Sequence, residues 1–264
     1  MIQQEILCAT DLTPASDVAL RYAVLIGKGL GAPVTHLHIL PKKERSEEAR
    51  SAVEAAMRQQ RDRCGAGGIE GSRLVEGEVI QGIGEETAKY SGFLVAGTHG
   101  PKGLRQSLLG ADMLKLVRRS ALPAIVVQEG YEVAPPASIV LPVAAHPDIH
   151  RLMDAVCALA KTFGAEVHLY QLARPNEEPS AELKANKERV IDRLQKEGIK
   201  WVHPVESSGV FSMGFAEPTI RYSQKVGAGL IAVMSQASDE YRYMADAEKE
   251  RLLTNFARIP VLYA

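Results

Sequence analysis

The chain has 264 residues, enough for one large domain or two of ordinary size. Its 31 basic and 32 acidic residues give a net charge of −1, which argues against a general affinity for nucleic acid or anionic membranes. The start of the chain lacks the regions of a signal peptide, and no apolar run approaches the length of a membrane span. Three widely spaced cysteines are typical of reduced thiols, so we expect a cytoplasmic protein without membrane or nucleic-acid partners.

Short apolar runs alternate with amphipathic segments through the first half of the chain. Five such runs predict strands, at residues 5–10, 34–40, 73–76, 93–96 and 124–128. The segments between them predict helices, one with Val18, Tyr22, Leu25 and Ile26 on one face, one at 44–63, one around 84–90 and one that Pro123 ends. This alternation predicts an α/β fold with a parallel sheet and helices on both faces.

The second half of the chain repeats the first. Residues 163–167 resemble residues 30–34 at an offset of 133, and residues 259–263 resemble 122–126 at an offset of 137. The second copy therefore carries four extra residues, which we assign to the loop at 207–217.

This duplication predicts two domains of ordinary size. The first spans residues 1–130 and the second spans residues 138–264. The linker at 130–137 contains one glycine and two prolines, which are typical of a connecting segment.

Three glycines follow the fourth apolar run. Gly97, Gly100 and Gly110 have the spacing G-x2-G-x9-G, and a predicted helix comes directly after them. Glycines let backbone amides approach a ligand closely, and a helix N-terminus favours anions. The motif predicts a phosphate-binding loop, with a tight strand-to-helix connection that binds nothing as the alternative.

The residues around these glycines resemble a known signature. Residues 94–103 and 108–110 resemble the universal stress protein family, whose signature is G-x2-G-x9-G followed by serine or threonine. Asp11 after the first strand, residues 37–39 and the closing run at 122–127 also resemble that family. The resemblance covers both halves, so the chain is similar to a tandem-type universal stress protein.

The resemblance implies two Rossmann-like domains of the adenine nucleotide alpha hydrolase-like type. Each would hold a five-stranded parallel sheet of order 3-2-1-4-5 with helices on both faces. In members that bind ATP, the nucleotide lies over the carboxyl ends of the strands. The binding residues implied in this chain are Ala9, Asp11, Ile39, Ala96, Gly97, Thr98, Gly100, Gly110 and Ala111.

Each of these positions has an implied role. Asp11 would contact the adenosine part, and the backbone of Ile39 would bond to adenine. Ala9 and Ala96 would line the base and sugar, and the glycine amides would surround the phosphates. Asp11 has a second interpretation, as the N-cap of the first helix, which is compatible with the first.

The chain departs from the signature at Ala111, where the family has serine or threonine. Loss of that hydroxyl would weaken nucleotide binding by roughly 1.5–3 kcal/mol. Lys102, Arg105 or Ser107 would be able to compensate. We therefore expect weak to moderate binding of ATP or another adenine nucleotide (ADP or AMP) by the first domain.

The second domain lacks the motif. The positions that correspond to the three glycines and to Asp11 are Met234, Ala237, Ala247 and Ala144. Asp239, Glu240 and Asp246 add negative charge where phosphates would lie. We expect no nucleotide in this domain.

Two histidines four residues apart, His146 and His150, have the spacing of metal ligands on a helix. No third ligand has a recognisable spacing, and Pro147 at the start of a helix explains the pair equally well. We expect no metal.

Three classes of function remain. The favoured one is a regulatory stress-response protein that binds a nucleotide and has no catalytic residues. A slow ATPase and a nucleotide-independent scaffold are the alternatives; ligase motifs such as S-G-G-x-D-S are absent from the sequence. The family resemblance also implies a pseudo-dimer within the chain, through strands 124–128 and 261–263, and allows a homodimer.

Overall fold

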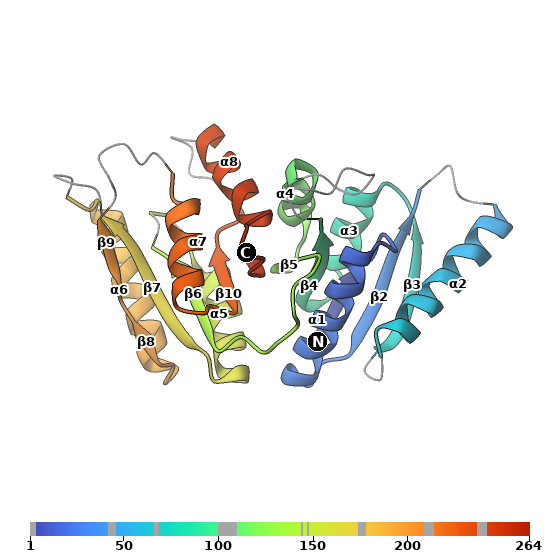
Figure 1. Ribbon diagram of the computed structural model, residues 1–264, viewed down its shortest axis with the longest axis horizontal. Coiled ribbons are helices and arrows are strands. Elements are labelled where there is room, and N and C mark those ends of the chain that lie inside the picture. Colours follow the sequence, from blue (N-terminus) through green and yellow to red (C-terminus); the bar gives the residue numbers. More distant parts are fainter. Residues whose placement is uncertain are drawn as a thin grey trace. The chain divides into compact units, whose positions relative to one another are not determined.

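The computed structural model describes residues 4–41, 46–65, 69–99, 110–143, 145–146, 148–173, 178–207, 214–236 and 242–264. The chain divides into two compact units, Met1–Ala134 and Pro135–Ala264 (Figure 1). Within the described ranges no helix is both long and apolar enough to cross a membrane.

The first unit contains a five-stranded parallel sheet. Its strands are β1 (Gln4–Ala9), β2 (Val34–Leu40), β3 (Ile69–Glu76), β4 (Ser91–Thr98) and β5 (Ala124–Gln128). They pair in the order β3-β2-β1-β4-β5, so the predicted order 3-2-1-4-5 is confirmed. The central strand β1 is apolar from Ile6 onwards because both of its faces are covered there, and Ile6, Leu7 and Cys8 are fully buried.

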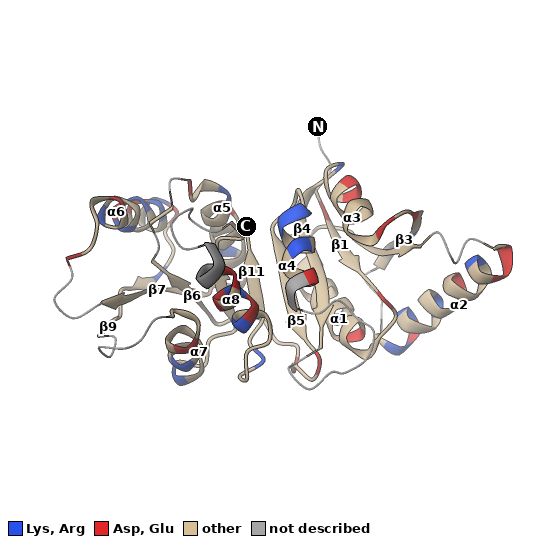
Figure 2. Cartoon of the chain, turned by 90° about the horizontal axis from the view of Figure 1, so that it is seen from above, with Lys and Arg blue, Asp and Glu red and all other residues tan. Residues whose placement is uncertain are grey.

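Four helices connect these strands. They are α1 (Pro14–Leu30), α2 (Glu47–Arg63), α3 (Val79–Thr87) and α4 (Gly110–Arg119). Helix α1 packs on β1, β4 and β5, and α3 packs on α4 and β2. Charged side chains lie mainly on the helices, and the strands carry few of them, as expected for a sheet that is buried on both faces (Figure 2).

Helix α3 begins earlier than the sequence pattern predicts. The expected helix around residues 84–90 spans Val79–Thr87 instead. Glycines at 82 and 84 weaken the helical pattern. They also allow close packing, because a Cβ atom on Gly82 would lie 3.0 Å from Cδ1 of Ile39, and one on Gly84 would lie 2.8 Å from Cγ of Arg119. Tertiary packing overrides the low helix propensity here.

The second unit repeats this sheet with one interruption. Its strands are β6 (Ser138–Pro142), β7 (Glu166–Ala173), β8 (Trp201–Val202), β9 (Val205–Ser207), β10 (Leu230–Val233) and β11 (Val261–Tyr263). The order β8-β7-β6-β10-β11 again corresponds to 3-2-1-4-5. The third strand is split, since β8 and β9 both pair with β7 on either side of Pro204, which has no N–H to donate to a ladder.

The helices of the second unit also follow the repeat. They are α5 (His150–Phe163), α6 (Ala181–Lys196), α7 (Ala216–Lys225) and α8 (Arg242–Leu253). Helices α1 and α5 end in the same way, because Gly31 and Gly164 both adopt left-handed backbone conformations, with φ angles of 64° and 65°. These are two of the positions that the sequence offset of 133 relates to each other.

Helix α5 begins later than expected. Its first residue is His150, with Ile149 as the N-cap, and Pro147 lies outside the described residues. The carboxylate of Asp148 accepts a hydrogen bond of 2.9 Å from the amide of His150 and so satisfies a donor of the first turn.

Candidate functional site

The turn that follows β1 presents Asp11 at the carboxyl edge of the sheet. Asp11 is exposed, and its Oδ1 accepts hydrogen bonds from the amide of Thr13 at 3.1 Å and from the hydroxyl of Thr13 at 2.6 Å. The N-cap of α1 is Thr13, with Pro14 at the first helical position, so the interpretation of Asp11 as the N-cap residue is wrong. The Oδ1 atom of Asp11 thus stabilises the turn that leads into α1.

Leu12 carries the strain of this turn. Its φ angle of 64° lies in the left-handed region, which non-glycine residues seldom adopt. The amide of Leu12 donates to Oγ1 of Thr10 at 2.9 Å, and the amide of Thr10 donates to the carbonyl of Leu37 at 2.9 Å. The turn is therefore tied to the end of β2.

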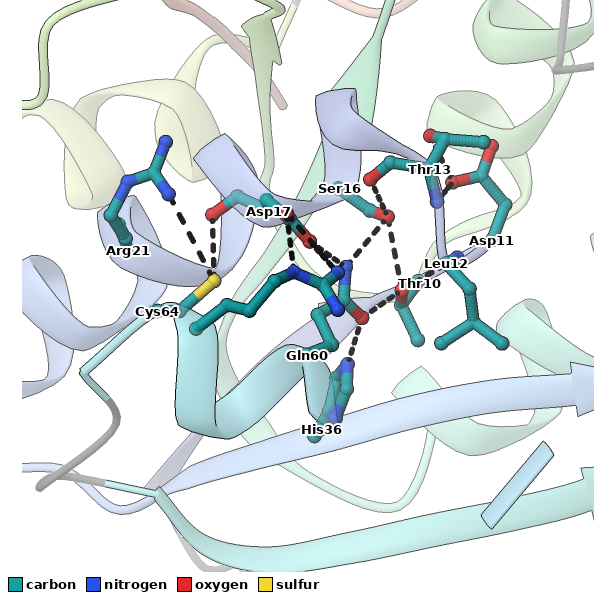
Figure 3. Close-up of polar contacts among 11 residues, drawn as sticks. Thr10, Asp11, Leu12, Thr13, Ser16, Asp17, Arg21, His36, Gln60 and Cys64 are labelled. Carbon is teal, nitrogen blue, oxygen red and sulfur yellow. Dashed lines mark hydrogen bonds and ion pairs between the residues drawn. The ribbon is translucent and has the colours of Figure 1, made fainter. Parts of the chain in front are cut away.

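A buried polar cluster lies behind the turn (Figure 3). Its centre is the amide of Gln60, which comes from α2 and is fully buried. Gln60 Nε2 donates to Oγ of Ser16 at 3.1 Å and to Oδ1 of Asp17 at 2.5 Å. Gln60 Oε1 accepts from Thr10 Oγ1 at 2.7 Å and from His36 Nε2 at 3.0 Å. Both protons and both lone pairs of this amide are satisfied, as a buried amide requires.

His36 contributes to this cluster as a neutral ring. Its Nε2 must carry the proton, because the oxygen of the Gln60 amide can only accept. Burial lowers the pKa of His36 to about 4, although the hydrogen bond to Gln60 acts in the opposite direction. Its Nδ1 is buried and has no hydrogen-bond partner within the described ranges.

Packing alone explains why residue 97 is a glycine, without any ligand. A Cβ atom at this position would lie 2.4 Å from the carbonyl oxygen of Ala15 and 2.7 Å from the amide nitrogen of Ser16. The end of β4 therefore runs directly against the first turn of α1, and only glycine fits. This contact accounts for the first glycine of the motif by packing alone.

The other predicted residues of the strands lie at the same edge of the sheet. Ala9 and Ala96 are register partners at the ends of β1 and β4. The pairing of β1 with β2 ends at Leu37, two residues before Ile39. Ile39 is buried and pairs with Val75 of β3. The fold thus brings Ala9, Asp11 and Ala96 together at the central strands, with Ile39 at the end of the next strand.

The segment after β4 contains a hydrogen-bonded pair of side chains that the sequence analysis does not predict. Nδ1 of His99 lies 2.7 Å from Oε2 of Glu129, which follows β5. Thr98, another predicted residue, is buried, and its carbonyl accepts a hydrogen bond of 3.0 Å from the amide of Glu129. No local pattern indicates this pair, because 30 residues separate its members.

The structure describes only the two ends of the predicted phosphate loop. Gly100 lies outside the described residues, as do Lys102, Arg105 and Ser107. Gly110 is the first residue of α4, and Ala111 follows it in the same helix. The motif therefore ends at a helix N-terminus, a position that favours anions.

The corresponding edge of the second unit is organised differently. Lys249 of α8 is buried, and its Nζ donates to the carbonyl oxygens of Ser235, at 3.3 Å, and of Gln236. These two residues follow β10 and Met234, which occupies the position of Gly97 in the repeat. Ala144, Ala237, Asp239 and Glu240 lie outside the described residues. At this edge of the second unit, carbonyl oxygens accept hydrogen bonds from the Lys249 ammonium. A phosphate-binding loop would instead present backbone amides there.

The pair His146 and His150 belongs to no metal site in the part of the chain that the structure describes. That part contains no group of three or more His, Cys, Asp or Glu side chains able to hold a metal ion. The carbonyl of His146 instead accepts a hydrogen bond from Asn186 of α6 at 2.6 Å. Burial, followed by the charge of Lys249, lowers the pKa of the His146 ring.

Comparison with known proteins identifies the first unit. The model of the universal stress protein family matches residues 3–128. The chain is similar in structure to a universal stress protein from Archaeoglobus fulgidus DSM 4304, with a TM-score of 0.75 and 18% sequence identity. The superposition covers 98% of this chain and 97% of the Archaeoglobus chain. It is also similar to a protein of unknown function from Pseudomonas aeruginosa PAO1, with a TM-score of 0.57 and 15% sequence identity. That superposition covers 99% of this chain and 92% of the Pseudomonas chain. No curated protein matches the sequence significantly. At these identities the structures share the fold, and they do so across both halves.

The packing of Gly97 predicts a loss of stability on substitution. Gly97→Ala should lower the free energy of unfolding in urea by about 1–3 kcal/mol, because Cβ would overlap the backbone of α1. Gly77→Ala is the matched control, since no atom lies within 4 Å of the added Cβ and its φ angle is not positive. A Gly97→Ala protein as stable as the unsubstituted chain would contradict this packing argument.

His36 predicts a pH-dependent contribution to stability. The pKa of His36 is lowered to about 4 in the folded state, so the unfolded chain binds more protons between about pH 6.5 and pH 4. The contribution is complete above pH 6.5 and is lost as the pH falls towards 4, by about 3 kcal/mol in total.

Urea unfolding of the chain and of His36→Gln across this pH range measures that contribution as the difference between their slopes. Subtracting the two removes the titration of the carboxylates, which both proteins share. Identical slopes would show that His36 titrates in the same way in the folded and unfolded states.

Proposed function

Because the model of the universal stress protein family matches residues 3–128, we propose that the first unit binds an adenine nucleotide. The site would lie at the carboxyl ends of β1, β2 and β4. Binding would regulate a stress response without chemical turnover, by stabilising the first unit or changing what it associates with.

The arrangement of Asp11 is the observation that carries this proposal. In a doubly wound sheet, ligands bind outside the carboxyl ends of the strands where the winding direction changes. In the first unit that point lies between β1 and β4. Asp11 is exposed beside it, and one of its carboxylate oxygens is held by Thr13. Ala9 and Ala96 are small side chains at the ends of the same two strands. An oriented carboxylate next to small apolar residues suits the hydroxyls and the flat base of a nucleoside.

The buried Gln60 cluster also supports this proposal, because it stabilises the turn that carries Asp11. The hydrogen bonds of Gln60 to Thr10 and Ser16 hold both ends of the turn that presents Asp11. Leu12 keeps its left-handed backbone within this turn. Backbone strain of this kind persists only where the surroundings determine it, and it is concentrated at functional sites. A turn that is rigid before binding loses less entropy when a ligand arrives.

For the second unit we propose that no nucleotide binds at the corresponding edge. A phosphate site needs backbone amides that point at the ligand. The carbonyl oxygens of Ser235 and Gln236 instead accept hydrogen bonds from the Lys249 ammonium. Met234 supports this proposal, because it carries a side chain where the first unit has Gly97.

Calorimetric titration of the full chain with ATP tests the proposal. Asp11→Ala should lower the affinity about tenfold or more, as expected for the loss of a hydrogen bond to a charged group. Asp11→Asn keeps an oxygen for Thr13 and removes the charge, so it separates ligand contact from the support of the turn. Asp192→Ala, at an exposed position in α6, is the matched control and should bind as the unsubstituted chain does.

The proposal has a clear contrary outcome. If ATP, ADP and AMP all give no heat and no rise in the unfolding temperature of the chain, the first unit binds no adenine nucleotide. The scaffold function would then replace the one proposed.

A further inference from the structure

The pair formed by His99 and Glu129 lies at the edge of the sheet where the proposed site ends. His99 directly follows β4, and Glu129 directly follows β5. These strands are parallel neighbours, with Thr98 opposite Gln128. A backbone hydrogen bond of 3.0 Å from the Glu129 amide to the Thr98 carbonyl holds the two segments together immediately before the side chains meet.

The contact with Glu129 determines which nitrogen of the His99 ring carries a proton and donates it in a hydrogen bond. A carboxylate can only accept, so Nδ1 of His99 donates across the 2.7 Å contact. Glu129 is the one charged group in contact with the ring among the described residues. The side chain of Glu129 is 46% exposed and that of His99 is 16% exposed, so the carboxylate reaches inward from solvent to orient the ring.

The second ring nitrogen, Nε2, has no hydrogen-bond partner among the described residues. Nε2 of His99 is buried and makes no hydrogen bond to any residue in the described part of the chain. A buried ring nitrogen without a partner costs free energy, and such atoms are rare in folded proteins. An oriented ring with one free nitrogen, next to a predicted nucleotide site, suggests that the missing partner is a ligand.

We infer that Nε2 of His99 contacts a phosphate oxygen of the bound nucleotide, and that Glu129 positions the ring for this contact. The inference rests on the function proposed above. The ring would then bridge the Glu129 carboxylate, through Nδ1, and the phosphate, through Nε2.

The location of His99 favours phosphate over the nucleoside. Asp11 and Ala9 occupy the end of β1, where the nucleoside is proposed. His99 lies beyond Gly97 and Thr98 on β4, on the chain segment that leads to the N-terminus of α4 at Gly110. A phosphate contact from the ring would also replace the hydroxyl that the family signature supplies at the position of Ala111.

The inference is tested by comparing ATP with adenosine as probes. His99→Leu in the full chain should lower the affinity for ATP about tenfold or more and leave the affinity for adenosine within about twofold. His99→Gln, whose amide can still donate, should restore part of the ATP affinity. Glu129→Ala should give a smaller loss for ATP and none for adenosine. His150→Leu, at an exposed position in the second unit, is the control.

Each outcome decides the question. Equal losses for ATP and adenosine would mean that His99 contacts the nucleoside or merely supports the fold, and unchanged ATP affinity in His99→Leu would mean that it contacts nothing; both overturn the inference alone. A failure of the unsubstituted chain to bind ATP overturns the proposed function together with it. If His99→Leu does not fold, the half-exposed Glu129→Ala variant still decides between these results.

Discussion

The candidate site depends on one buried side-chain amide, that of Gln60. Its four hydrogen bonds join residues from α1, from β2 and from the turn after β1 to a single point on α2. The amide of Gln60 is fully satisfied, whereas Nδ1 of His36 in the same cluster is buried without a partner within the described ranges, at a cost in desolvation. The turn that presents Asp11 is thus held by buried contacts that come from α1, α2 and β2.

The two units show that the fold and the site are separable. Both have the same order of strands and the same left-handed glycine at the end of the first helix. Their carboxyl edges differ, since the second unit has a buried Lys249 bonded to carbonyl oxygens. Its Glu248 also accepts a hydrogen bond of 2.6 Å from the amide of Ala216 at the start of α7. After duplication, the apolar strands are enough to maintain the sheet, and the edge is free to change.

The first unit also shows why a motif does not assign a role to each of its residues. Gly97 is required because β4 touches the backbone of α1. Gly110 begins helix α4, and a helix N-terminus favours anions. Two glycines of one signature therefore serve different purposes, one in packing and one at the edge where a ligand would lie. His99, between them, adds a ring that Glu129 orients.

The sequence by itself determined the duplication and the α/β class, because these follow from local periodicity and from the repeat. The resemblance of its short motifs to the universal stress protein family implied the strand order, which the structure confirms. The predicted places of Ala9, Asp11 and Ala96 at the central strands follow from the same order. Only the tertiary structure decided the early start of α3, the packing reason for Gly97, the Gln60 cluster and the pairing of His99 with Glu129. Each of these joins residues that are distant in the chain, such as Thr10 and Gln60, which are 50 positions apart. No local pattern records such a contact, since it exists only when parallel strands and their helices have been brought side by side.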